Sequence, residues 1–322
     1  MPSPTAQLST TRPDIAETME EFDLDANNNK MVATQVLPVF DVPTQAGKFG
    51  KIPVEELLQN ADTERSSQSG YNRSKYKFTD HFYVTSEHGK EEVVDDRDEQ
   101  MYSDYFDLEV IAAKRARANI LINQEIRAAN NTISNASVTG AAAATVWTTH
   151  ASATPIADVN AAVLAIYNRT GVWPDSICLS YSLFRELRQC TEVLDRIQSA
   201  GAGDQTRATD VTVQQIAQVF DLNNVLVAGA SKNSADQGLA VSVAQIWDET
   251  RCFVFKSANS VDLKEPCFGR TFHWSQDGSQ IGGMVETYRD ETVRADVVRC
   301  RHEVQENVVY TELGQRITGC KA

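Results

Sequence analysis

The longest regular pattern of apolar and polar positions in the chain lies between residues 104 and 131. This stretch contains no proline or glycine, and strong helix formers dominate it. Ser103 or Asp104 can cap its start, and Asn130 with Asn131 suits its end. The pattern predicts one unbroken helix, about 40 Å long at a rise of about 1.5 Å per residue.

Two sets of apolar side chains follow this predicted helix. The main stripe consists of Leu108, Ile111, Ala112, Ala118, Ile122, Ile126 and Ala129. The second set faces elsewhere and consists of Val110, Ala113, Ile120, Leu121 and Ala128. We therefore expect the helix to be contacted from more than one side. Arg115 and Asn119 interrupt the main stripe, which predicts buried or interface partners for both.

The segment before the helix, residues 47–99, alternates like a half-buried strand. Its apolar face is predicted to hold Tyr76, Phe78, Phe82 and Val84, with Lys77, Thr79, His81 and Tyr83 on the other face. Gly89 is expected to mark a turn, after which residues 91–95 continue in extended form. The sequence predicts an extended hairpin with little core of its own, and an isolated hairpin is only marginally stable in water.

Charge is segregated along this hairpin. Residues 65–77 carry bases and no acid, namely Arg65, Arg73, Lys75 and Lys77. Residues 87–99 carry Lys90 and Arg97 against a majority of acids, namely Glu87, Glu91, Glu92, Asp95, Asp96, Asp98 and Glu99. Solvated charge is the usual explanation of such runs.

Residues 1–46 have the composition of an arm rather than of a domain. The first 14 residues are rich in Pro, Ser and Thr, and an acidic segment follows. Only residues 31–42 are apolar enough to pack. An arm this polar cannot bury itself, so it is either disordered or lies across a partner, and both alternatives remain open.

A compact α/β lobe is predicted after a linker of small residues at 134–155. Its first helix is expected to be capped by Asp158 and to end at Gly171. Residues 176–180 predict a strand, and Ser180 or Ser182 opens a helix that continues to residue 197. Thr212 and Gln215 form a capping box for a further helix. Strands are predicted within residues 224–229, 239–247 and 252–256.

The chain is predicted to end in two strands. In the first, Arg299, Arg301 and Glu303 alternate with apolar or packed positions, namely Val298, Cys300, His302 and Val304. The second lies within residues 306–319 and has a turn at Gly314. Together the patterns predict an α+β protein.

Composition narrows the class of function. The chain has 322 residues, a net charge of −14, 42% hydrophobic and 23% charged residues, all compatible with a highly soluble globular protein. A nucleic-acid-binding role of its own is disfavoured, because phosphate contacts need clusters of Lys and Arg. Six widely spaced cysteines indicate neither a zinc ribbon nor a disulfide framework. We expect neither a signal peptide nor a membrane span.

Catalytic patterns are not evident, so no catalytic, cofactor-binding or metal-binding residue is predicted. His81 and His88 have the wrong spacing for a metal pair on one strand face, which favours surface or cross-strand packing. His302 is predicted to be a packed core residue. Asp95, Asp96 and Asp98 lack the glycine and terminal glutamate of a calcium loop.

The order of these parts resembles tailed-phage major capsid proteins of the HK97 fold. Residues 49–96 resemble the family's E-loop, 104–130 the spine helix, 173–197 the start of the A-domain, and the last likeness covers residues 243–256, 268–274 and 285–319. The resemblance implies an N-terminal arm at 1–46, an E-loop at 47–99, a P-domain at 100–150 and 282–322, and an A-domain at 151–281.

The resemblance also implies a structural subunit and not an enzyme. Copies would form the pentamers and hexamers of an icosahedral virion shell around DNA, without sequence-specific DNA binding, cofactor or membrane contact. Separate scaffold, portal and decoration proteins are potential partners, and covalent crosslinking of the loop lysines is not expected. The interface is expected to involve the charged hairpin and the helix, through Arg65, Arg73, Lys75, Lys77, Glu91, Glu92, Asp95, Asp96 and Arg115.

Two alternatives remain open. The first is an encapsulin-like nanocompartment with the same fold, which would package an enzyme instead of DNA. The second is a soluble α/β enzyme, which would require a polar pocket that the sequence does not reveal.

Overall fold

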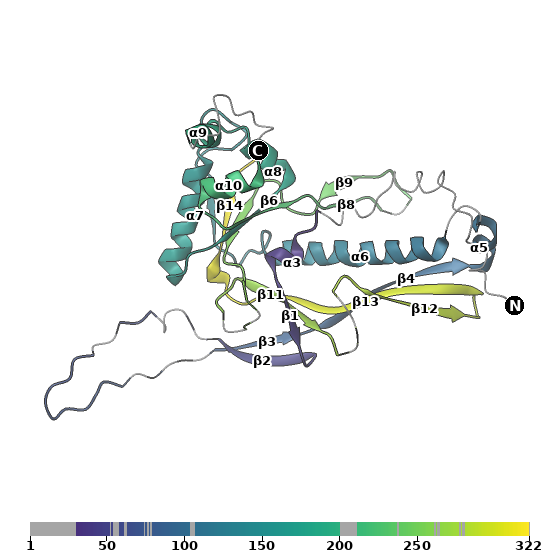
Figure 1. Cartoon of the computed structure of the whole chain (residues 1–322), viewed down its shortest axis with the longest axis horizontal. Helices are drawn as coiled ribbons and strands as arrows, with labels where there is room; N and C mark the ends of the chain where they lie inside the picture. The colour runs from purple at the N-terminus through teal and green to yellow at the C-terminus, as the bar shows by residue number, and fades with distance from the viewer. Residues whose placement is uncertain are drawn as a thin grey trace.

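The described part of the chain forms a mixed α+β molecule with an elongated body (Figure 1). The computed structural model describes residues 30–51, 53, 58–60, 63–73, 75, 77, 79–103, 107–199, 211–236, 238–260, 262, 265–276, 278 and 281–321. These residues form four β-sheets, of which two are five-stranded and two are two-stranded. Of the predicted arm, residues 1–46, the first 29 residues lie outside the described part.

Strand β13 (Ala295–Val308) is the centre of the first five-stranded sheet. Strand β4 (Ser86–Asp95) runs antiparallel along one side of it. The other side pairs with β12 (Met284–Asp290) and then with β11 (Gly269–Trp274). Strand β1 (Val39–Val42) adds to β11 in parallel. The longest strand thus ties segments from both ends of the chain into one sheet.

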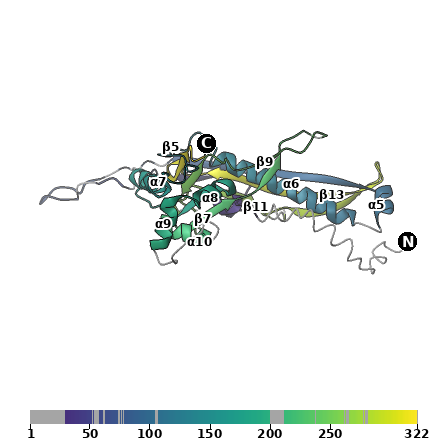
Figure 2. The same ribbon diagram turned by 90° about the horizontal axis from the view of Figure 1, so that it is seen from above.

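The predicted alternation in β13 is confirmed. Val298, Cys300, His302 and Val304 are all buried, at 0–1% exposure. They form the face of the sheet that helix α6 (Leu108–Asn131) covers, as Figures 1 and 2 show. The alternation of residue types along β13 therefore predicted correctly which face of this strand is buried.

The start of α6 differs from the prediction. The side chain of Asp107 accepts a hydrogen bond from the Val110 amide at 3.2 Å, so Asp107 is the cap. Ser103 instead follows a separate short helix, α5 (Asp96–Tyr102), and Asp104 lies outside the described residues. The predicted helix therefore begins one turn later than expected, and α5 is a separate helix before it that the sequence analysis did not predict.

Helix α6 is contacted from two sides, as predicted, but through partly different residues. Ala112, Ala116 and Ile120 pack over Val298 and Cys300 of the sheet. Small side chains permit this close approach of helix and strand. Ala118, Glu125 and Ala129 are buried on the other side, at helical spacing.

Polar residues of α6 also depart from the prediction. Arg115 and Asn119 are exposed, and Asn119 donates to the Arg115 carbonyl within the helix, so the prediction of buried partners is wrong, whereas interface partners for the two residues stay a prediction. Gln124 and Glu125 are buried instead. Apolar periodicity cannot identify such positions, because a polar side chain is buried only where partners from other segments satisfy it.

Glu125 joins three separate segments. Its carboxylate accepts hydrogen bonds from the Val32 and Ala33 amides, both at 2.9 Å, and from the Trp247 indole nitrogen at 2.6 Å. The two amides begin the short helix α3 (Ala33–Val36), whose free N–H groups need acceptors. Burial raises the pKa of Glu125, and the three donors oppose that rise.

A polar cluster lies under the C-terminal half of α6. Arg127 holds Glu306 of β13 through two hydrogen bonds of 2.8 and 3.0 Å. The rings of His88 and His302 meet edge to face across β4 and β13, at 5.9 Å. His302 is fully buried, and neither of its ring nitrogens has a hydrogen-bond partner among the described residues. Burial, reinforced by Arg127, lowers the pKa of His302 to about 3.

The second five-stranded sheet is the centre of the lobe at one end of the body. Its order is β5-β14-β10-β6-β7, with bounds Gly140–Ala142, Gly314–Thr318, Cys252–Phe255, Ser176–Ser180 and Asn224–Ala228. Around it lie helices α7, α8, α9 and α10, with bounds Pro155–Thr170, Tyr181–Leu187, Thr191–Ser199 and Val213–Phe220. The largest apolar core fills this lobe and continues to Leu37 and Ala129.

Several predicted helix ends in the lobe are confirmed and two are wrong. Gly171 ends α7 in a left-handed conformation, Ser180 caps α8, and Thr212 forms the capping box of α10. Asp158 is not a cap, because its carboxylate binds the Trp147 indole at 3.0 Å instead. The helix predicted up to residue 197 is broken into α8 and α9.

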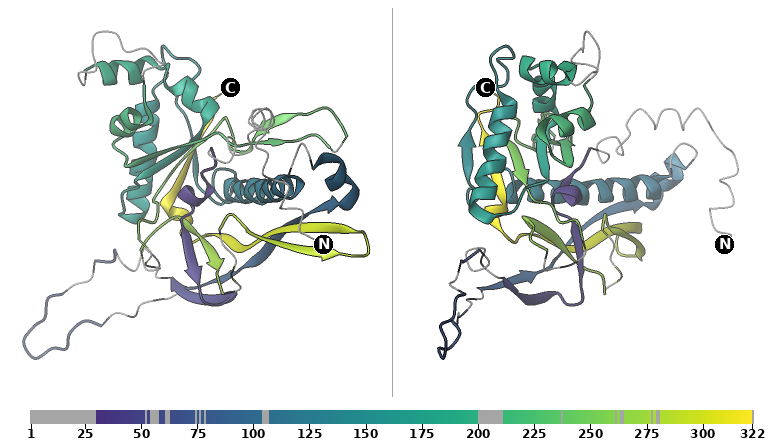
Figure 3. Two further views of the ribbon diagram at one scale, coloured as in Figure 1. Left: turned by 45° about the vertical axis from the view of Figure 1, so that its right-hand side comes forward. Right: turned by 60° about the vertical axis from the view of Figure 1, so that its left-hand side comes forward.

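Two pairs of strands project from the body. Strands β2 (Ala46–Lys51) and β3 (Thr79–Val84) form the base of a long loop, and β8 (Ser231–Asn233) pairs with β9 (Val243–Gln245) in a hairpin (Figure 3). Strand β9 is much shorter than predicted. Among the described residues, no helix is both long and apolar enough to cross a membrane.

The predicted apolar face of β3 is inverted. Tyr83 is buried and its ring stacks on Phe272 at 4.8 Å, whereas Phe82 is 63% exposed and Val84 is also exposed. Tyr76 and Phe78 lie outside the described residues. The turn predicted at Gly89 is also wrong, because Gly89 lies within β4 opposite Arg301.

Replacing Glu125 by glutamine is expected to destabilise the fold. An amide of the same shape places an N–H group against backbone or indole donors, which leaves buried groups unsatisfied at a cost of about 1–3 kcal/mol. Chemical denaturation of Glu125→Gln and of the matched control Glu109→Gln, at the exposed start of the same helix, measures this. Equal unfolding free energies for both variants would contradict the role of Glu125.

Acid is expected to destabilise the protein through His302. Its folded pKa of about 3 lies below its ordinary value of 6.5, so the unfolded chain binds the proton first. The contribution of His302 to the free energy of unfolding is therefore fully present above pH 6.5. Below pH 6.5 the free energy of unfolding falls by about 1.4 kcal/mol per pH unit. Unfolding of the protein and of His302→Leu between pH 4.5 and 6.5 measures this, and an unchanged slope in the variant argues against it.

Candidate assembly surfaces

The basic residues predicted at the hairpin tip lie on the long loop between β2 and β3, which projects from the body (Figures 1 and 3). The guanidinium of Arg65 lies over the Tyr71 ring at 4.8 Å and donates to the Ser69 carbonyl at 2.7 Å. Arg73, Lys75 and Lys77 are exposed. We call residues 63–77 the basic loop, since their side chains present positive charge and the open face of Tyr71.

The acidic residues predicted as its partners are largely engaged within the chain. Glu91 accepts a hydrogen bond from Arg299 at 2.7 Å, and Glu92 lies 3.8 Å from Arg115. Asp95 caps α5 through the Arg97 amide at 2.8 Å. These pairs reduce the charge that residues 91–95 present to a second molecule.

A ladder of charges covers the face of the sheet opposite α6. Arg299 and Arg301 project from the central strand β13. Glu286 on β12 contacts both, while Glu91 and Glu87 on β4 contact one each. Because acids on β12 and β4 flank the two arginines of β13, this face of the sheet is close to neutral, and cross-strand ion pairs stabilise it.

Negative charge is concentrated instead at the far end of the body. Residues 95–103, 107–109 and 289–296, which we call the acidic end, carry nine acids against three arginines. They are contiguous, because Arg289 binds Asp96 at 2.7 Å and lies 3.4 Å from Asp296. Burial and then the charge of Asp296 raise the pKa of Glu109, which shows that acids crowd one another here.

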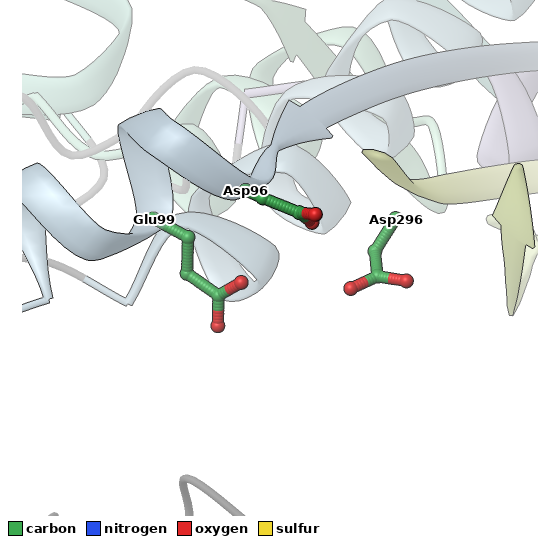
Figure 4. Close-up of side chains that lie close together, drawn as sticks. All are labelled: Asp96, Glu99 and Asp296. Atoms are coloured by element: carbon green, nitrogen blue, oxygen red, sulfur yellow. The ribbon is translucent and has the colours of Figure 1, made fainter. Parts of the chain in front are cut away.

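Three carboxylates of the acidic end converge, as Figure 4 shows for Asp96, Glu99 and Asp296. One oxygen of each lies within 4.8 Å of the others, a spacing that a metal ion could bridge. Arg289 already supplies a cation to Asp96 and Asp296, and it lowers the pKa of Asp96. The cluster is therefore explained by an internal ion pair.

The other reactive side chains are packed. All six cysteines are buried free thiols, and burial raises the pKa of Cys190 to about 12, so its thiolate does not form at neutral pH. His81 lies against Phe49 at 5.1 Å and His88 against His302. The predicted cross-strand packing of these two histidines is thus confirmed.

Several of the most exposed apolar side chains lie on the projecting parts. The long loop and its base expose Leu58, Tyr71, Phe82 and Val84, and the β8–β9 hairpin exposes Leu239, Val241 and Val243. Sequence analysis placed Phe82 and Val84 on a strand but missed the hairpin. In the sequence, Leu239, Val241 and Val243 alternate with small residues. A buried strand shows the same alternation, so the pattern does not reveal that these side chains are exposed.

The comparisons with known proteins concern structure alone, because no protein-family profile and no curated protein matches the chain. A phage-related protein from Bordetella bronchiseptica has a TM-score of 0.65 and 16% identity, covering 98% of each chain. The capsid protein of cyanophage P-SCSP1u has a TM-score of 0.56 and 11% identity, covering 89% of this chain and 87% of that one.

An encapsulin complex from Synechococcus elongatus is also similar, with a TM-score of 0.53 and 10% identity over 89% of this chain and 86% of that one. At these identities the likeness establishes the fold. The chain therefore has the fold of phage capsid and encapsulin subunits, over almost its whole length.

Proposed function

We propose that the chain is the major capsid protein of a tailed phage, of the HK97 type, and that it is not an enzyme. The observation that carries this proposal is the structural likeness to a phage-related protein over 98% of the chain and to a cyanophage capsid protein over 89% of it. In this proposal copies form pentamers and hexamers of an icosahedral virion shell that encloses DNA. Scaffold, portal and decoration proteins would be its further partners.

The proposed parts are those of the resemblance: an arm at 1–46, an E-loop at 47–99, a P-domain at 100–150 and 282–322, and an A-domain at 151–281. The sheets connect these parts. Strand β14, within the proposed P-domain range, pairs with β10 of the lobe, and β11, within the proposed A-domain range, pairs with β13. Two adjoining domains that exchange strands would move as one body, leaving the arm and loop as the adaptable elements.

The proposed contact between copies is head to tail. The basic loop and the acidic end lie at opposite ends of the long axis (Figures 1 and 2). Because the two surfaces differ, a contact between them is heterologous and closes into a ring when the rotation allows it. Arg73, Lys75 and Lys77 would face carboxylates such as Asp98 and Glu291 of the next copy.

Each such pair is weak, at about 0–1 kcal/mol for exposed charges. Apolar groups of the loop, such as Tyr71 and Leu58, would supply burial when a neighbour covers them. The charges would then set orientation and register, as electrostatic complementarity does at other interfaces. The net charge of −14 is compatible with a shell that encloses DNA without binding it tightly.

A second candidate is an encapsulin-type compartment, favoured by the structural likeness to an encapsulin complex. Both candidates share the subunit and the closed shell and differ in the contents. Nucleic-acid and protein analysis of purified particles separates them, because the phage role requires packaged DNA and the other a packaged protein.

The expressed chain is expected to assemble. Size-exclusion chromatography followed by negative-stain microscopy should give capsomers or closed particles, because the exposed apolar side chains of the long loop would be covered between copies. A monodisperse monomer at high concentration, with or without added scaffold from the same source, would overturn the shell proposal.

Reversing the loop charges with Arg73→Glu and Lys75→Glu is expected to abolish capsomers while leaving the subunit folded, because both side chains are exposed. A compensating reversal, Asp98→Lys with Glu291→Lys, should restore assembly in the quadruple variant. Chromatography measures assembly, and circular dichroism measures folding.

The matched control reverses two exposed bases of the lobe, Arg185→Glu on α8 with Arg196→Glu on α9. It changes the net charge equally and should assemble normally. Loss of assembly in this control, or normal particles from Arg73→Glu with Lys75→Glu, would refute the head-to-tail contact without refuting the shell.

A further inference from the structure

The β8–β9 hairpin exposes apolar side chains on an ordered scaffold. Leu239, Val241 and Val243 are 68%, 73% and 71% exposed, among the highest values for large apolar residues in the described chain. Val241 and Val243 are alternate residues of β9 and its extension and so point to one side, and Leu239 lies two residues before Val241, at the turn. We call these three residues the apolar strip. Burying these apolar side chains would be favourable, and the chain forgoes this stabilisation as long as the strip is exposed to solvent.

Hydrogen bonds stabilise the hairpin beyond its paired strand residues. The Ser234 amide donates to the Ser242 carbonyl at 2.8 Å, beyond the last paired strand residues. The Asn233 side chain accepts from the amides of Ala235 at 3.1 Å and Ser242 at 3.0 Å. These bonds hold the strip in a fixed shape, which is what a docking surface requires.

The described chain begins beside the base of this hairpin. The Lys30 carbonyl accepts a hydrogen bond from the Gly229 amide at 3.1 Å, and the Lys30 side chain passes over Gly229. Gly229 lies two residues before β8. Val32 and Ala33 are then fixed by Glu125. Residues 1–29 are therefore tethered at the base of the hairpin.

The tethered segment carries matching side chains within reach. Its large apolar residues near Lys30 are Ile15, Met19, Phe22 and Leu24, and they stand among acids. Leu239 lies at most about 26 Å from Ser231, because the chain turns between them, whereas the eleven residues from Lys30 to Met19 can span up to about 36 Å. Residues 23–29 are acidic or Asn apart from Leu24 and Ala26, and they would serve as a linker.

We propose that the apolar strip of the β8–β9 hairpin is the docking surface for residues 15–22 of the same chain. The tether raises the effective concentration of this segment at the strip to about the millimolar range, which favours it over a partner in solution. Docking would cover the strip and keep the acids of the segment in solvent. The inference concerns one subunit and does not rest on shell assembly.

A cysteine pair tests this contact in the whole protein. Met19→Cys with Val241→Cys is treated with a short bismaleimide, and peptide mass spectrometry identifies the crosslink. The six native thiols do not compete, because each is at most 1% exposed. Val241 is exposed, so its replacement does not threaten folding. The crosslink is expected to exceed that of the control pair by at least about tenfold.

The control pair is Met19→Cys with Leu164→Cys, since Leu164 is exposed on helix α7, away from the hairpin (Figure 1). Mixing isotopically heavy and light chains before crosslinking separates contacts within a chain from contacts between chains. Equal crosslinking of both pairs, or a majority of mixed heavy–light crosslinks, would overturn the proposal. The second result would assign the strip to a neighbouring copy's arm.

Discussion

The body of the molecule depends on one buried carboxylate. Glu125 sits on the helix that covers the β13 sheet, and it satisfies donors from the chain's first described residues and from Trp247 of the lobe. Without it, two helix-start amides and an indole would be buried with no acceptor, and α3 would lose its attachment to α6. The cost of burying a charge is thus offset by fixing three segments at one point.

This constraint divides the molecule into a rigid part and projecting parts. Around Glu125 the core of the lobe is continuous with α3 and the end of α6, and Arg127 clamps the same helix to β13 through Glu306. The long loop and the β8–β9 hairpin have no comparable buried anchor, and their apolar side chains remain exposed. A rigid body with such appendages is suited to contacts that are completed by other segments or other copies.

The sequence predicted elements whose determinants are local. Gly171, Ser180 and Thr212 each cap or end the helix beside them in the sequence. The alternation along β13 reflects the burial of one face of that strand. It failed where the cause was a distant segment. Tyr83 rather than Phe82 is buried because Phe272 lies on its side of β3, and Asp158 turns from its helix end toward Trp147. The pairing of Glu91 with Arg299 likewise joins residues 208 positions apart.

Charge placement follows the same division and bears on how copies meet. A chain with a net charge of −14 repels its own kind unless opposite charges are separated in space. Here the sheet face is neutralised internally by Arg299 and Arg301, which leaves an excess of acid at one end and of base on the loop at the other. Side-by-side copies in the same orientation would align like charges, whereas a head-to-tail order brings opposite charges together. In the proposed head-to-tail contact, repulsion would disfavour the other arrangements, and the weak attraction between opposite ends would need only to choose among the arrangements that remain.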